Sequence, residues 1–139
     1  MTERAPLPRP SALTEGFWAA ARERRLVVQA CDACGRRRHY PQVLCPDCRG
    51  DRWSWAPIGG RGIVYSFTVS HRAFGAAWAD RVPYAIATID LGDGIRMVSD
   101  LPPEDTEDVA IGLAAEVFFE DIGEVTLPRF KLVRPLTGR

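Results

Sequence analysis

Several features are scarce or missing in this 139-residue sequence. It has two histidines and a single lysine, Lys131, and its eighteen basic residues balance eighteen acidic ones. A chain without net charge has no overall field that attracts nucleic acid or an anionic membrane. No apolar run approaches the roughly 20 residues that cross a bilayer, and residues 1–10 contain no apolar segment of a signal peptide. We therefore expect a soluble cytoplasmic protein, either one domain or two small modules that share a core.

Motifs for common enzyme chemistry are also missing. The sequence contains no Ser-His-Asp, paired-carboxylate, Walker or dinucleotide-binding glycine pattern. Gly59, Gly60 and Gly62 precede a predicted strand rather than a helix, so we interpret them as a flexible joint. His39 is a candidate metal ligand or a plain loop residue, and His71 is a candidate base or anion contact that stands alone. We expect the chain to catalyse no reaction by itself.

The four cysteines form the strongest motif. They occur as two Cys-x-x-Cys pairs separated by ten residues: Cys31, Cys34, Cys45 and Cys48. Two such pairs supply the four thiolates of a tetrahedral zinc site, and the glycines after each pair permit the tight turns that the site needs. Disulfides and a redox pair are alternatives, but a cytosolic setting and a β-rich chain count against both. Four cysteines leave no open coordination position, so we expect one structural zinc ion and no catalytic metal.

Charge is distributed unevenly along the chain. Residues 1–61 hold eleven basic and six acidic residues (+5), whereas residues 62–139 hold seven and twelve (−5). Arg36, Arg37 and Arg38 follow the first cysteine pair and could bind phosphates of a coenzyme or a nucleic acid. The alternative is a solvated basic face. An acidic second half would repel a nucleic-acid backbone, which disfavours the nucleic-acid interpretation.

The remaining pattern predicts a mainly β protein. A short helix follows Thr14 and carries Phe17, Trp18 and Arg22, after an extended arm over residues 1–10. Alternating or β-branched segments predict strands at 26–30, 53–55, 63–70, 84–91, 95–101, 113–120 and 125–133. The acidic, proline-rich residues 102–108 are expected to form a solvated linker. The last five strands fit a five-stranded OB-fold barrel better than a sandwich, which needs about seven. Accordingly, we predict an arm and helix (1–25), a zinc ribbon (26–58) and a barrel (59–139).

The order of these elements resembles a known family, the acyl-CoA-associated OB-fold proteins with a rubredoxin-like zinc ribbon. The similarity runs from about residue 11 to residue 133, and the cysteine quartet followed by the strand Gly60-x-Gly62-x-Val64-Tyr65-Ser66 is its most specific part. Further matches are Tyr40-Pro41, Trp53-x-Trp55, Pro83-Tyr84, Ile111-Gly112 and Leu127-Pro128-x-Phe130.

The resemblance implies an accessory role. Members of this family partner thiolase-like, aldolase or hydratase enzymes, and in steroid side-chain degradation a similar domain partners a thiolase-like aldolase that cleaves a CoA thioester by a retro-aldol step. The resemblance therefore implies a non-catalytic subunit of a hetero-oligomer, with a CoA thioester at the shared site.

From the residues we add two expectations. Arg36–Arg38 would receive coenzyme phosphates, and the partner would dock on exposed side chains of the helix and of the loop after residue 70. These docking residues are Phe17, Trp18, Arg22, Phe74 and Trp78. The rival hypothesis is an OB-fold and zinc-ribbon binder of single-stranded nucleic acid.

Overall fold

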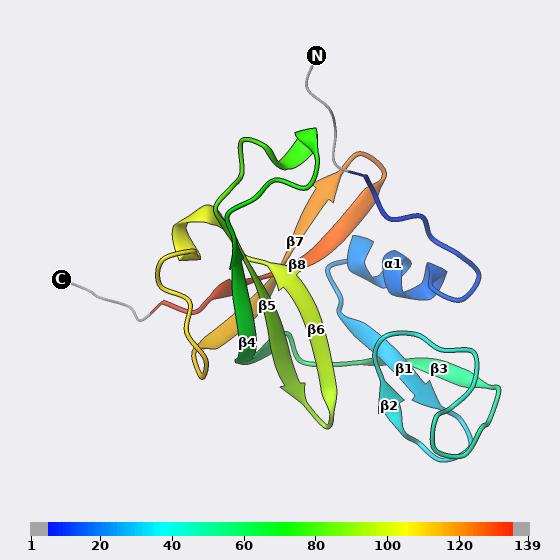
Figure 1. Cartoon of the computed structure of the whole chain (residues 1–139). Coiled ribbons are helices and arrows are strands. Elements are labelled where there is room, and N and C mark those ends of the chain that lie inside the picture. The colour runs from blue at the N-terminus through cyan, green and yellow to red at the C-terminus, as the bar shows by residue number, and fades with distance from the viewer. Residues whose placement is uncertain (1–5, 135–139) are drawn as a thin grey trace.

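The computed structural model describes residues 6–134. These residues form two β-sheets and one α-helix, arranged as Figure 1 shows. Residues 1–5 of the predicted arm lie outside the described part. The elements in chain order are α1 (Glu15–Arg22), β1 (Val27–Cys31), β2 (Arg37–Arg38), β3 (Trp53–Pro57), β4 (Arg61–Ser70), the 3-10 turn η1 (Ala76–Trp78), β5 (Tyr84–Gly92), β6 (Ile95–Asp100), the 3-10 turn η2 (Pro103–Asp105), β7 (Ala114–Ile122) and β8 (Val125–Leu132). Among the described residues, no helix is long and apolar enough to cross a membrane.

The first sheet is the ribbon. It has three antiparallel strands in the order β2-β1-β3, and β1 pairs with β3 along its whole length, from Val27 opposite Pro57 to Cys31 opposite Trp53. Cys31 is the last residue of β1, and its partner Trp53 begins β3 shortly after Cys48. Both cysteine pairs therefore lie at the same end of this sheet.

The second sheet is the five-stranded barrel that the strand pattern predicts. All of its pairings are antiparallel, in the order β6-β5-β4-β7-β8, which places β6 and β8 at the two edges. Figure 1 shows the sheet curving so that its edges approach each other. The mainly β architecture with one short helix, a ribbon and an OB-fold sheet is thus confirmed.

The alternation predicted for residues 63–70 is broken by a bulge in β4. The register with β5 shifts between Val64 and Ser66, so Val64 pairs with Ile89 and Phe67 pairs with Ala87. A bulge exchanges the two faces of a strand. Val64 is buried, whereas Ile63 and Tyr65 on the other face are about half exposed.

One apolar core joins the two sheets. Phe17 of α1 and Val28 of β1 belong to the same buried cluster as Ile89 and Phe130 of the barrel. The helix lies beside β8 and above the ribbon in Figure 1. It ends at Arg22, and Arg24 then takes a left-handed backbone conformation at φ 63°.

The glycine segment before β4 is packed rather than flexible. A Cβ added to Gly60 would lie 2.2 Å from Cγ1 of Val117, and one on Gly62 would lie 2.4 Å from the carbonyl oxygen of Asp90. The N–H of Val117 also donates to the carbonyl of Gly60 at 2.7 Å. These glycines therefore allow close approach of two backbones, and the expected joint is a fixed contact.

The acidic segment 102–108 is also not a solvated linker. It contains η2, and the Asp105 side chain is almost fully buried. Asp105 accepts a hydrogen bond from the N–H of Leu132 at 3.0 Å and pairs with Arg134. A carboxylate in the segment thus fastens the end of β8 to the barrel.

Candidate functional site

The four cysteine sulfurs meet at the end of the ribbon, and all lie within 4.8 Å of one another. The Sγ atoms of Cys31 and Cys48 are 3.5 Å apart, and those of Cys34 and Cys45 are 3.6 Å apart. Each pair closes on a turn, since the N–H of Gly35 donates to Cys31 O at 2.8 Å and that of Arg49 donates to Cys45 O at 2.9 Å. One member of each pair is buried and the other is exposed.

The two turns use different residues in the left-handed conformation. Gly35 takes it in the first turn at φ 79°, but in the second turn Arg49 takes it at φ 64°. Gly50 serves another purpose, because a Cβ there would lie 3.3 Å from the sulfurs of both Cys31 and Cys48. The second glycine predicted to permit a turn instead makes room for the sulfurs.

Backbone N–H groups favour thiolates at the two buried sulfurs, whereas contact with neighbouring sulfurs raises the pKa of Cys48 to about 12, and burial and neighbouring sulfurs raise that of Cys34. Hydrogen bonds from backbone N–H groups of Cys48 and Asp47 lower the pKa of Cys45 to about 6, and those from Cys34 and Ala33 lower the pKa of Cys31. Thiolates are the form that binds zinc, so the donor set and its surroundings fit a tetrahedral metal.

The three neighbouring arginines do not act together. Arg36 pairs with Asp47 of the second cysteine turn. The Arg38 side chain is buried, and its Nε donates to Oε1 of Gln29 at 2.7 Å. Arg37 is exposed and makes no ion pair within residues 6–134. Arg38 therefore stabilises the inside of the ribbon, and the expectation that all three face a ligand is wrong for this residue.

A cavity of about 300 Å³ lies where helix, ribbon and barrel meet. Its lining is mostly apolar and aromatic and comes from α1, the ribbon loop after β2, β6 and β8: Thr14, Phe17, Trp18, His39, Tyr40, Pro41, Met97, Val98, Ser99, Asp100, Leu127, Pro128, Arg129 and Phe130. A mainly apolar hollow with a few polar groups at one end is the usual form of a small-molecule site.

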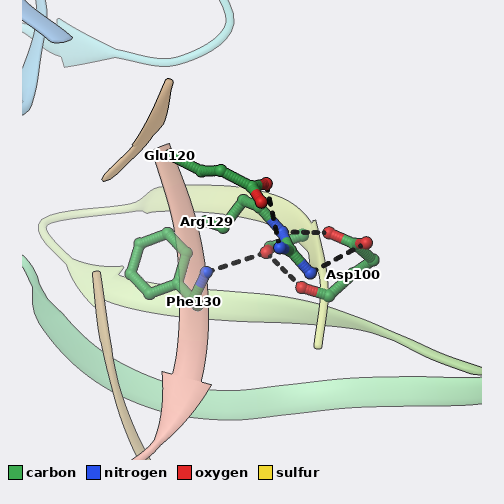
Figure 2. Close-up of polar contacts among 5 residues, drawn as sticks. Asp100, Glu120, Arg129 and Phe130 are labelled. Atoms are coloured by element: carbon green, nitrogen blue, oxygen red, sulfur yellow. Dashed lines mark hydrogen bonds and ion pairs between the residues drawn. The ribbon is translucent and has the colours of Figure 1, made fainter. Parts of the chain in front are cut away.

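At the polar end of this cavity, side chains and backbone groups of β6 and β8 are joined by the contacts that Figure 2 shows. Arg129 donates from Nε and Nη2 to the two carboxylate oxygens of Asp100, at 2.9 and 3.1 Å, and from Nη1 to Glu120 at 3.1 Å. The N–H of Phe130 donates to the Ser99 hydroxyl at 2.9 Å, and that hydroxyl donates to the carbonyl of Asp100 at 2.6 Å. Two carboxylates outweigh one guanidinium here, so this end offers no free positive charge to a phosphate.

Two residues of the ribbon loop form the opposite wall. The His39 ring stacks on Phe17 at 5.4 Å and lies 4.0 Å from the Tyr40 ring, measured between centroids. Burial lowers the pKa of His39 to about 4, so its imidazole is neutral at pH 7. The Tyr40 hydroxyl accepts a hydrogen bond from the N–H of Val98 on the edge strand β6 at 3.0 Å.

The residues predicted to dock a partner are divided between core and surface. Phe17 is part of the shared core and Trp18 packs against it. Arg22 is exposed, and its Nη2 donates to the carbonyl of Glu124 at 3.3 Å. On the loop between β4 and β5, Phe74 is 77% exposed beside Arg72, and Trp78 is half-buried. The loop residues are therefore accessible, whereas the two aromatic residues of the helix serve the fold.

Sequence reasoning missed an apolar strip on the outside of the barrel. Ile63, Tyr65, Ile111 and Leu113 are 40% to 69% exposed. They lie close together because the N–H of Val64 donates to the carbonyl of Leu113 at 2.8 Å. The Arg96 guanidinium covers the Tyr65 ring at 3.7 Å. The alternation of residues in β4 was a signal for this strip. Which face of the alternation points outward depends on the bulge.

Two family models together match most of the chain. Residues 18–54 match "ChsH2, rubredoxin-like zinc ribbon domain", and residues 55–120 match "ChsH2, C-terminal OB-fold domain". The first model and the sulfur cluster agree on a rubredoxin-like zinc ribbon.

Two known proteins are similar to this chain in sequence, and one solved chain is similar in structure. A probable enoyl-CoA hydratase alpha subunit of Thermomonospora curvata is 36% identical over 92% of this chain, which spans 40% of that protein. A DUF35 domain-containing scaffold protein of Methanocaldococcus jannaschii is 31% identical over 77% of each chain. A solved chain titled "Ltp2-ChsH2(DUF35) aldolase" is 32% identical with a TM-score of 0.80, covering 91% of this chain and 98% of that one.

Proposed function

The chain belongs to the ChsH2 family, and we propose that it is a non-catalytic scaffold subunit of an enzyme that acts on acyl-CoA thioesters. The partner would be a thiolase-like aldolase, a thiolase or a hydratase. The observation that carries this proposal is the similarity over nearly the whole of both chains to a chain of the Ltp2-ChsH2(DUF35) aldolase. The similarity to the hydratase subunit and to the scaffold protein supports the same class of function.

The chemistry of the cavity supports a binding role rather than a catalytic one. The Ser99 hydroxyl is directed at a backbone carbonyl, so no neighbouring base activates it as a nucleophile. Arg129 is held between two carboxylates, and His39 is stacked between aromatic rings. Groups fixed in this way can shape and orient a ligand, while the reacting groups come from the partner.

We assign the apolar cavity to the acyl part of the thioester. Its aromatic lining suits a bulky hydrocarbon, such as the steroid group that the family resemblance implies. The phosphates of CoA would bind outside it, at Arg37 with the help of Arg36. One zinc ion held by the four cysteines would stabilise the ribbon when bound, and those residues keep the loop after β2 in place.

The partner would dock on exposed apolar side chains. Phe74 and Trp78 of the loop remain candidates, and the strip of Ile63, Tyr65, Ile111 and Leu113 extends the available surface. Large aromatic and arginine side chains, such as Tyr65 under Arg96, are typical of binding hot spots.

Purification of the tagged chain from its native host at moderate salt tests this proposal. We expect mass spectrometry to identify a thiolase-like, aldolase or hydratase partner, and a metal assay on the same sample to give about one zinc per chain. Acyl-CoA turnover should require the partner. Capture of nucleic acid, capture of no acyl-CoA enzyme, or turnover by the chain alone would contradict the proposal.

A pair of arginine variants tests the phosphate assignment within that complex. Arg37→Glu should weaken binding of free CoA at least fivefold, because it reverses the charge at the proposed phosphate contact. Arg52→Glu is the matched control, since Arg52 is an exposed arginine that follows the second cysteine turn. Equal effects of the two variants would show that only the general charge of the ribbon matters.

A further inference from the structure

We propose that Gln29 and Arg38 are positioning residues that make one wall of the cavity an extension of the zinc ribbon, so that metal occupancy and binding in the cavity influence each other. The ligand's identity rests on the proposed function, whereas the link between ribbon and cavity wall does not. Contacts run without interruption from the cysteines to the edge of the barrel.

The first step is a buried polar network inside the ribbon. Gln29 is fully buried on β1, two residues before Cys31. Its Oε1 accepts from Arg38 Nε at 2.7 Å and from the N–H of Gln42 at 2.8 Å. Arg38 also donates from Nη2 to the carbonyl of Gln42 at 3.1 Å. The two ends of the loop at residues 38–42 are therefore fastened to the strand that leads into the first cysteine turn.

The second step is the loop itself. His39, Tyr40 and Pro41, the residues between the two fastened ends, all line the cavity. The two residues that precede them in the chain, Arg37 and Arg38, form β2. This strand pairs with β1, with Arg37 opposite Ala30 and Arg38 opposite Gln29. A change at the cysteines therefore reaches these wall residues through one short strand and one side-chain network.

The third step is the contact with the barrel. The Tyr40 hydroxyl accepts from the N–H of Val98 on β6, and β6 is an edge strand of the barrel sheet. Val98 also lines the cavity. Tyr40 thus covers an edge amide that would otherwise face water, and it holds the ribbon wall against the barrel wall.

These contacts predict thermodynamic coupling. If the metal keeps the loop in the shape that closes the cavity, then a ligand that binds the closed cavity must in turn retain the metal, since coupling between two sites is reciprocal. The other walls come from α1, β6 and β8, which do not contain metal-binding residues. Coupling therefore depends on the network and on Tyr40.

Amide hydrogen exchange tests the structural link without any ligand. In the whole chain, removal of zinc with a chelator should raise exchange at Val98 by about tenfold or more, with little change at Ile89 in the barrel core. Tyr40→Phe should give fast exchange at Val98 even with zinc bound. Tyr65→Phe, which removes an exposed tyrosine hydroxyl on β4, is the matched control and should behave like the natural chain. Unchanged exchange at Val98 after zinc removal would overturn the proposal.

Zinc release tests the coupling. Saturating decanoyl-CoA should slow transfer of zinc from the folded chain to a chromogenic chelator by about tenfold. The double variant Gln29→Met/Arg38→Met replaces both polar partners with apolar groups, which preserves a buried pair better than removing one partner. It should bind zinc and decanoyl-CoA, but the ligand should change zinc release less than twofold. A natural chain that binds decanoyl-CoA and releases zinc at an unchanged rate overturns the coupling. A chain that does not bind decanoyl-CoA overturns the cavity assignment of the proposed function, and the positioning role is then decided by hydrogen exchange in Gln29→Met/Arg38→Met, which should give fast exchange at Val98 even with zinc bound; exchange as slow as in the natural chain would overturn that role.

Discussion

Residues 31–52 of the ribbon and the strands of the barrel are held together by different forces. In residues 31–52 the buried side chains are Cys31, Cys45 and Arg38, and none of the three belongs to the apolar core. The barrel buries a continuous apolar set that includes Val64, Ile89, Ile95 and Phe130. The ribbon therefore depends on directional bonds to a metal and between polar groups, whereas the barrel depends on apolar area removed from water.

Removal of zinc should cause the largest difference in stability between the two regions. Binding of structural zinc contributes on the order of 10 kcal/mol in small zinc modules, so chelation should unfold residues 31–52. Exchange protection should disappear in β2 and the cysteine turns and persist in β4, β5 and β7. Simultaneous loss of protection in both regions would show that they form one cooperative unit instead.

Truncation of a core side chain should affect the barrel next most. Phe130 is the largest fully buried side chain, and Phe130→Ala should lower the free energy of unfolding by about 3–5 kcal/mol in urea titrations. Phe74→Ala is the control of the same chemistry and should change it by less than about 0.5 kcal/mol, because Phe74 is exposed. Similar losses for both variants would contradict the assignment of the core.

Acid should weaken the contact between the two regions through His39. Its pKa falls from 6.5 to about 4 on folding, so the unfolded chain binds the extra proton between these values and stability decreases as pH falls from about 6.5 to 4. The decrease amounts to about 3 kcal/mol at most. His39→Phe should flatten this part of the pH profile, measured by urea unfolding at several pH values. His71→Asn, which changes the exposed histidine after β4, should leave the slope as it is.

A smaller effect tests whether the regions are joined by a hinge. Gly60→Ala should cost about 1–3 kcal/mol, because the added methyl would overlap Val117. Gly59→Ala has open space around it and should change stability by less than about 0.5 kcal/mol. Thermal unfolding of the two variants makes the comparison, and equal stability would restore the interpretation of this segment as a flexible joint.

The sequence predicted features that depend on spacing. Two Cys-x-x-Cys pairs can meet at one ion whatever surrounds them, and five strand-like segments in the right order were sufficient for an OB-fold sheet. The turn at Gly92–Gly94 and the strands on both sides were also predictable from local residue preferences.

Features that depend on distant neighbours were not predictable. The side of the sheet on which Tyr65 lies depends on the bulge in β4, and the pairing with β5 sets the position of that bulge. The burial of Arg38 depends on its acceptor Gln29, which lies on another strand. The role of Asp105 required the position of Leu132, which is 27 residues away in the chain. The cavity is built from four separate elements, so no single segment of the sequence indicates it.

The pairing of β1 with β3 has a consequence for how this protein can be divided. The two family models meet between residues 54 and 55, which is inside β3. A barrel that begins at residue 55 would keep part of a strand without its neighbour, and a ribbon that ends at residue 54 would leave half of β1 with unpaired backbone groups. Any transplant or gene fusion that cuts at this boundary would leave an unpaired strand edge on each of the two pieces. The smallest piece that can be transplanted with this pairing intact is therefore the whole span from α1 to β8, even though the boundary between the two family models divides it.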